Sequence, residues 1–138
     1  YMFSQATTLR EAADEALYVL RLLNGRALQL PVYFDWEPVQ AEDSRTADNG
    51  DLLLTAQART FCAIIEKGGY DAGVYMNRQQ GYYRYDLRSL TDYRLWIADY
   101  GDWPDFYYRF DVWQYAADGR LDGVSEILDL NVELVPVG

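Results

Sequence analysis

The sequence has no histidine and only one cysteine in 138 residues. Without histidine, the chain cannot build a Ser-His-Asp or Cys-His catalytic site, and it lacks the commonest zinc ligand. The single thiol, Cys62, allows no internal disulfide. Cys62 lies within the apolar helical run ARTFCAIIEK at residues 58–67, so we expect it to be a core thiol and not a nucleophile.

Basic residues and long apolar runs are also scarce. Twelve lysines and arginines stand against 22 acids, the net charge is −10, and no basic stripe is present, which argues against a nucleic-acid partner. No apolar run approaches the ~20 residues of a membrane-spanning helix, so no membrane partner is expected. The length fits one domain but is short for a complete α/β barrel.

Aromatic residues, by contrast, are abundant. They make up 16% of the chain, with thirteen tyrosines and four tryptophans, and many stand beside acids, as in VYFDWE and LWIADY. Aromatic rings that stack on sugar faces, next to carboxylates that bind hydroxyl groups, would give this pattern. A tyrosine-rich rim around an ordinary core is the alternative interpretation.

The first half of the chain alternates between strand and helix patterns. Thr8 and Glu11 form a capping box ahead of a helical apolar pattern that ends at Asn24-Gly25. The predicted elements are a strand at 1–4, a helix from Thr8, a strand at 30–37, a surface loop at 38–50, a helix at 51–67, a strand at 71–77, a loop with a short helix at 78–92, and strands at 94–100, 110–116 and 125–134. This order predicts an α/β fold with parallel strands and right-handed crossovers, in the form of a (β/α) barrel or part of one.

Two acids end the strand LPVYFDWEP at residues 30–38. Side chains alternate along a strand, so Tyr33, Asp35 and Glu37 should share one face. The Cα atoms of the two acids would be roughly 6.5–7 Å apart, and their carboxyl groups could reach the separation of about 5–5.5 Å found in retaining glycosidases. The carboxyl end of a barrel strand is also where such enzymes place their catalytic groups. Mutual repulsion should raise the pKa of one acid, giving a proton donor beside an ionised base.

Six sequence blocks resemble glycoside hydrolase family 25, the lysozyme-like muramidases and endolysins. In order they are YMFSQATTLREAADEA, LPVYFDWEP, GVYMN, LWIADYG, VWQYA and GVSEILDLN, which together span Tyr1 to Asn131. The resemblance implies the irregular barrel of this family, whose later strands lack regular helices. It also implies hydrolysis of the β-1,4 bond between N-acetylmuramic acid and N-acetylglucosamine in peptidoglycan, extracellularly or at the cell wall, with no metal or organic cofactor.

The resemblance also implies roles for individual residues. Glu37 matches the general acid/base of the family, and Asp35 matches the acid that orients the acetamido group of the substrate or acts more directly. Asp129 matches the C-terminal acid of the cleft. The expected sugar-contacting residues are Tyr33, on the face of the two acids, and four residues that match the family's sugar site, namely Tyr75, Trp96, Tyr100 and Gln114.

The sequence departs from the family at its beginning. Family members open with a strand that carries a D-V-S-like motif, followed by a second strand, and neither is present. We therefore expect residues 1–138 to be an N-terminally incomplete catalytic domain that begins at the third strand. Exposed strand edges would favour self-association, and the chain alone should have little lytic activity.

Two alternatives remain open on the sequence. The chain could be a non-catalytic saccharide-binding remnant of such a domain, which keeps the aromatic cleft without activity. Alternatively, Asp35, Glu37 and Asp129 could bind a hard cation such as Ca²⁺.

Overall fold

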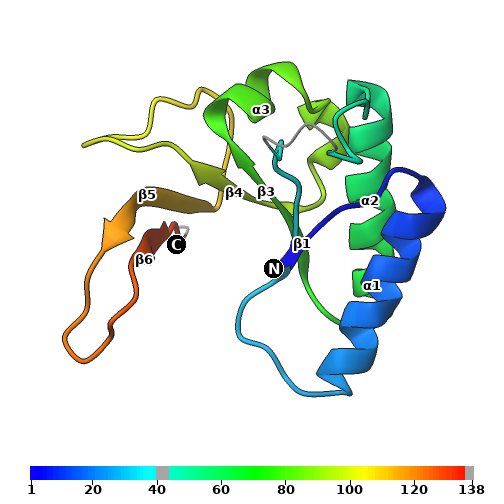
Figure 1. Cartoon of the computed structure of the whole chain (residues 1–138), viewed down its shortest axis with the longest axis horizontal. Helices are drawn as coiled ribbons and strands as arrows, with labels where there is room; N and C mark the ends of the chain where they lie inside the picture. Colours follow the sequence, from blue (N-terminus) through cyan, green and yellow to red (C-terminus); the bar gives the residue numbers. More distant parts are fainter. Residues whose placement is uncertain (40–43, 136–138) are drawn as a thin grey trace.

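The structure, a computed structural model, describes residues 1–39 and 44–135 and consists of one six-stranded sheet with helices (Figure 1). The elements in chain order are β1 (Met2–Phe3), α1 (Leu9–Leu23), β2 (Val32–Asp35), α2 (Asp51–Lys67), β3 (Ala72–Asn77), α3 (Arg78–Tyr83), the 3₁₀ helix η1 (Leu87–Leu90), β4 (Arg94–Ala98), β5 (Val112–Gly119) and β6 (Leu128–Glu133). The α/β class predicted from the sequence is confirmed. None of the described helices has both the length and the hydropathy to cross a membrane.

The predicted ends of α1 are confirmed by its capping contacts. The side chain of Thr8 accepts a hydrogen bond from the main-chain N–H of Glu11 at 3.1 Å. Asn24 adopts a left-handed conformation with φ of 47°, which ends the helix. The buried residues Ala12 and Ala16 are small, so α1 can lie close beside α2 (Figure 1).

The hydrophobic core lies between the sheet and the helices α1 and α2. The alternate residues Val32, Phe34 and Trp36 point into this core, as the strand pattern predicts, and Phe34 packs against Phe61 of α2 with ring centroids 5.5 Å apart. Cys62 is fully buried in the same core, where burial raises the pKa of its thiol. Its interpretation as a core thiol is confirmed.

The strand order is β1-β2-β3-β4-β5-β6, with the first five strands parallel and β6 antiparallel to β5. The register places Asp35 opposite Tyr75, and Tyr75 opposite Trp96, so side chains from three strands face the side of the sheet away from α1 and α2. Within the described residues β1 and β6 do not pair, and the sheet remains open rather than closing into a barrel. The β5–β6 hairpin projects away from the two long helices (Figure 1).

Two segments differ from the prediction. Residues 78–92, predicted as a loop with a short helix, form α3 immediately after β3 and then η1, because Asn77 and Gln80 make a capping box at the end of the strand. In the predicted surface loop 38–50, Thr46 and Asn49 are buried, and Asn49 donates a hydrogen bond to the main-chain oxygen of Ala6 at 2.9 Å. Residues 40–43 of that loop lie outside the described residues.

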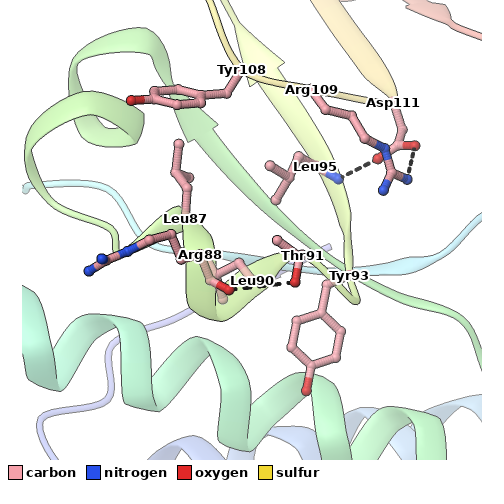
Figure 2. A pocket seen from close by; sticks show the side chains of 9 residues that line it. All are labelled: Leu87, Arg88, Leu90, Thr91, Tyr93, Leu95, Tyr108, Arg109 and Asp111. Atoms are coloured by element: carbon pink, nitrogen blue, oxygen red, sulfur yellow. Dashed lines mark hydrogen bonds and ion pairs between the residues drawn. The ribbon is translucent and has the colours of Figure 1, made fainter.

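A pocket of about 230 Å³ lies on the helical side of the sheet, between η1 and residues 108–111 (Figure 2). Its walls are mainly apolar, with Leu87, Leu90 and Leu95 among them, and the Arg109–Asp111 ion pair lies at one end. Leu95 precedes Trp96 on β4 and therefore points to the opposite face. None of the predicted site residues lines this pocket, so the candidate active site must be sought on the other face.

Gly73 gives a test of the close approach between β2, β3 and β4. A Cβ atom added there would lie 2.6 Å from the main-chain oxygen of Arg94 and 2.5 Å from a ring carbon of Tyr33. We expect Gly73→Ala to lower the free energy of unfolding by about 1–3 kcal/mol, because the Arg94 oxygen cannot move without disturbing the sheet. Denaturant unfolding measures the effect, and Gly101→Ala, whose nearest contact is 3.8 Å away, is the control. Equal stability of both variants and the parent would contradict this packing.

Candidate active site

Six of the eight predicted site residues line one small pocket on the sheet face opposite α1 and α2. These residues are Asp35, Glu37, Tyr75, Trp96, Gln114 and Asp129, and Tyr1 completes the lining of the pocket. The parallel register accounts for much of this grouping, since it sets Asp35 of β2 beside Tyr75 of β3 and Tyr75 beside Trp96 of β4, and it pairs the end of β4 with Gln114 of β5. β6 runs in the opposite direction, pairs Asn131 with Gln114, and contributes Asp129 to the same pocket.

Trp96 forms the centre of an aromatic floor. Its ring meets Tyr75 at 4.7 Å and Tyr33 at 5.2 Å between centroids, both edge-to-face, and Tyr1 at 6.2 Å. The indole N–H of Trp96 donates to the side-chain oxygen of Asn131 at 2.8 Å, which fixes the ring plane. Tyr33 lies just outside the small pocket, in an adjoining wider groove that Tyr1 and Trp96 also line.

Gln114 links Tyr75, inside the pocket, to Tyr100 at its rim. Its side-chain oxygen accepts hydrogen bonds from the hydroxyl of Tyr75 at 2.9 Å and from that of Tyr100 at 3.0 Å. Both phenols donate to the same oxygen, so the amide is held in one orientation and its NH₂ group is the polar end that remains. The predicted residue Tyr100, itself largely exposed, is thereby attached to the rim of the site.

Asp35 is a buried acid without a full set of hydrogen bonds. Its residue surface is 6% exposed, and its Oδ1 atom has no hydrogen-bond partner among the described residues. Burial, followed by the charge of Glu37, raises the pKa of Asp35 from 3.8 to about 7. The neutral form of Asp35 is therefore favoured in the folded protein at pH values where an exposed aspartate is ionised.

Glu37 is only partly buried, and burial together with the charge of Asp129 raises its pKa as well. Both acids therefore bind a proton more tightly than an exposed carboxyl group does. Asp35 and Glu37 together can hold one proton close to neutral pH, with Glu37 the more accessible of the two.

The carboxylates do not group in the way that a metal site requires. Asp35, Glu37 and Asp129 line the same pocket, but in residues 1–39 and 44–135 no three acid, cysteine or histidine side chains are arranged to hold a metal ion. The calcium alternative has no geometric support in this part of the chain.

Tyr1 and Gln80 are site residues that the sequence analysis missed. Tyr1 precedes a strand of only two residues, which is too short to show which face a side chain takes. Gln80 belongs to α3, and its amide donates to the main-chain oxygen of Trp36, between the two acids. The pattern N-x-x-Q at residues 77–80 resembles a capping box, and it was the sequence signal for a helix that starts at the end of β3.

The raised pKa of Asp35 predicts a pH-dependent stability. A folded-state pKa above the unfolded one stabilises the fold fully below the unfolded pKa, and this contribution is lost as pH rises through the folded pKa. For Asp35, the loss should therefore run from about pH 4 to about pH 7. We expect the melting temperature of Asp35→Asn to lie above that of the parent at about pH 8 and to equal it at about pH 4. The reason is that the amide that replaces the carboxyl group does not ionise.

Thermal unfolding at several pH values measures this difference. Asp14→Asn, the same change at an exposed position on α1, is the control. An Asp35→Asn offset that is the same at every pH would show that Asp35 ionises as readily in the fold as in the unfolded chain.

Comparisons with known proteins identify the family and the fold. The model of the family described as glycosyl hydrolases family 25 matches residues 1–124. Among solved structures, the CTP1L endolysin superposes with a TM-score of 0.74 at 23% identity, covering 94% of this chain and 44% of that chain. The spore cortex lytic enzyme SleM of Clostridium perfringens gives a TM-score of 0.74 at 24% identity, covering 95% and 46%.

The modular autolysin LytC of Streptococcus pneumoniae gives a TM-score of 0.74 at 21% identity, covering 91% of this chain and 31% of that chain. The chain thus spans less than half the length of these three proteins. At such identities the superpositions show a common fold. A search of curated proteins found no match. Because the family model matches 1–124 of 138 residues, the chain belongs to glycosyl hydrolases family 25.

Proposed function

We propose that the chain hydrolyses the β-1,4 bond between N-acetylmuramic acid and N-acetylglucosamine in peptidoglycan, acting at the cell wall. The observation that carries this proposal is the Asp35–Glu37 pair, which lies at the end of β2 in an aromatic pocket of a family 25 domain. The names of the similar structures, an endolysin, a spore cortex lytic enzyme and an autolysin, support the same substrate. LytC has also been solved with a synthetic peptidoglycan ligand.

Glu37 is the proposed general acid and base. It is the less buried acid of the pair, and its raised pKa allows it to carry a proton to the glycosidic oxygen. In the first step the proton passes from the Glu37 carboxyl group to that oxygen as the bond to the anomeric carbon breaks. In the second step the Glu37 carboxylate takes a proton from water, whose oxygen attacks the anomeric carbon and displaces the acetamido oxygen that bonded to it in the first step.

Asp35 is proposed to act on the acetamido group of the sugar. A retaining route can use the carbonyl oxygen of that group as the nucleophile at the anomeric carbon, with a carboxylate accepting the amide N–H. This route needs an ionised Asp35 and the proton on Glu37, whereas burial raises the pKa of Asp35 in the free protein. An amide N–H brought to the unpartnered Oδ1 of Asp35 stabilises its ionised form and so leaves the proton on Glu37.

The aromatic floor is proposed to hold the sugar ring. Trp96 is fixed by its hydrogen bond to Asn131 and by the surrounding tyrosine rings, so little side-chain entropy is lost when a sugar stacks on it. The hydroxyl groups of Tyr75 and Tyr100 and the amide of Gln114 supply polar contacts at the rim. Asp129, which lines the same pocket, can bind a sugar hydroxyl group, and its charge adds to burial in raising the pKa of Glu37.

The function predicts the effect of Glu37→Gln in the full-length parent protein, which is the form used for every measurement of activity. Removing the general acid should lower the rate of peptidoglycan hydrolysis by ~10²–10⁴ while the variant folds normally. The measurement is the release of new reducing ends from purified peptidoglycan, supported by mass spectrometry of the fragments. Glu66→Gln, the same change at an exposed position on α2, should keep the parent rate.

Two outcomes would count against the proposal in different ways. A Glu37→Gln variant with more than half the parent rate would remove Glu37 from the mechanism. A parent chain that binds peptidoglycan but releases no reducing ends would favour the saccharide-binding alternative.

We further propose that the chain self-associates through its strand edges. In the described part of the chain, the outer edges of β1 and β6 pair with no other strand, and unpaired main-chain groups at an edge favour strand addition. Tyr1 and Phe3, beside the β1 edge, are exposed and apolar. Light scattering over a range of concentrations should give a mass above that of the monomer, and a monomer mass throughout that range would contradict the proposal.

A further inference from the structure

The main chain that carries Glu37 lies beyond the paired part of β2. Pairing with β3 ends at Asp35 and Tyr75, and the main-chain oxygen of Asp35 accepts a hydrogen bond from Ser4. Trp36 and Glu37 follow without a ladder partner on either side. Contacts other than sheet pairing must therefore determine where the carboxyl group of Glu37 lies.

Gln80 supplies one of these contacts with both ends of its amide. The side-chain nitrogen of Gln80 donates to the main-chain oxygen of Trp36 at 2.9 Å. Its side-chain oxygen accepts from the main-chain N–H of Asn77 at 2.7 Å, at the end of β3. Gln80 is only 4% exposed, so water cannot readily replace either bond.

The side chain of Trp36 supplies the second contact. It is 1% exposed within the core, and the guanidinium group of Arg84 lies 4.9 Å from its ring centroid. Arg84 is itself held by the carboxylate of Asp51 and by the main-chain oxygen of Asn49. With Trp36 held on the core side, alternation directs Asp35 and Glu37 to the cleft side.

We propose that Gln80 is a positioning residue of the catalytic pair, which fixes the main chain at Trp36 and thereby holds the Glu37 carboxyl group in the cleft beside Asp35 and Asp129. The catalytic consequence rests on the proposed function, whereas the structural one does not. Without this hydrogen bond the segment 36–37 can shift toward solvent. A displacement of about 1 Å in a reacting group can lower a rate by up to about 100-fold.

The test uses a variant that removes the amide but keeps its size and its lack of charge. Gln80→Met has an unbranched side chain of similar length that can fill the same space, and Gln80→Leu is the second variant if the first folds poorly. Asn77→Ala is one control, because it removes the side-chain cap of α3 at Gln80 N and leaves the bond from Gln80 to Trp36. Gln57→Met is the other, because Gln57 is also a buried amide that donates to a main-chain oxygen, that of Ala6 at 3.0 Å.

The first measurement is the titration of Glu37, followed by NMR of its labelled side-chain carboxyl group. In Gln80→Met we expect the pKa of Glu37 to fall toward that of an exposed glutamate, because the carboxyl group moves away from Asp129 and into water. Both controls should leave that pKa at the parent value. A folded Gln80→Met or Gln80→Leu protein in which Glu37 titrates as in the parent would overturn the proposal.

The second measurement is the hydrolysis of peptidoglycan. We expect kcat of Gln80→Met to fall by about 10- to 100-fold with KM little changed. The basic limb of the pH–rate profile, where the general acid loses its proton, should move with the pKa of Glu37. If the parent releases no reducing ends but the Glu37 titration still shifts, the proposed function fails and the positioning role stands. If the parent is active, and Gln80→Met changes neither kcat nor the titration, the positioning role fails and the function stands.

Discussion

Burial of β2 on both faces is the constraint on which the site depends. All four of its residues, Val32 to Asp35, are buried, although the strand carries an acid. One face must be apolar because α1 and α2 cover it, and the other can be polar because it forms the floor of the cleft. The alternation of side chains along β2 therefore determines both which residues enter the core and which face of the sheet the acids take. A shift of one residue in register would exchange them, placing Asp35 in the core and Phe34 in the cleft.

The cost of this arrangement is electrostatic. A buried carboxyl group with an unpartnered oxygen is unfavourable when ionised, and Asp35 is in this position with Glu37 two residues away. The packing of Phe34, Phe61 and the other core side chains on the opposite face offsets that cost, so the strand remains in place. The raised pKa of Asp35 and the burial of the core are thus two results of the same placement of one strand.

Local patterns in the sequence predicted the parts of the fold that depend on short-range physics. The T-x-x-E box and Asn24-Gly25 gave both ends of α1, and alternation in VYFDWE gave the faces of β2 correctly. Sequence spacing could not give contacts between distant residues, such as the pair of phenols that donate to Gln114 or the bond from Gln80 to Trp36. The short helix expected within residues 78–92 is present as α3, but its start could not be located because its cap lies at the end of β3.

The open sheet gives the charges of this site an asymmetric environment. On the helical side the core excludes water from Trp36, while on the cleft side Glu37 remains partly accessible. An acid that must both give and take a proton needs such access, since a fully buried carboxyl group could not exchange its proton with substrate and water. Asp35, which is more deeply buried, is suited to a single partner that replaces its missing hydrogen bond. The difference in depth between Asp35, at the end of β2, and Glu37, two residues later, is the basis on which we propose different roles for the two acids.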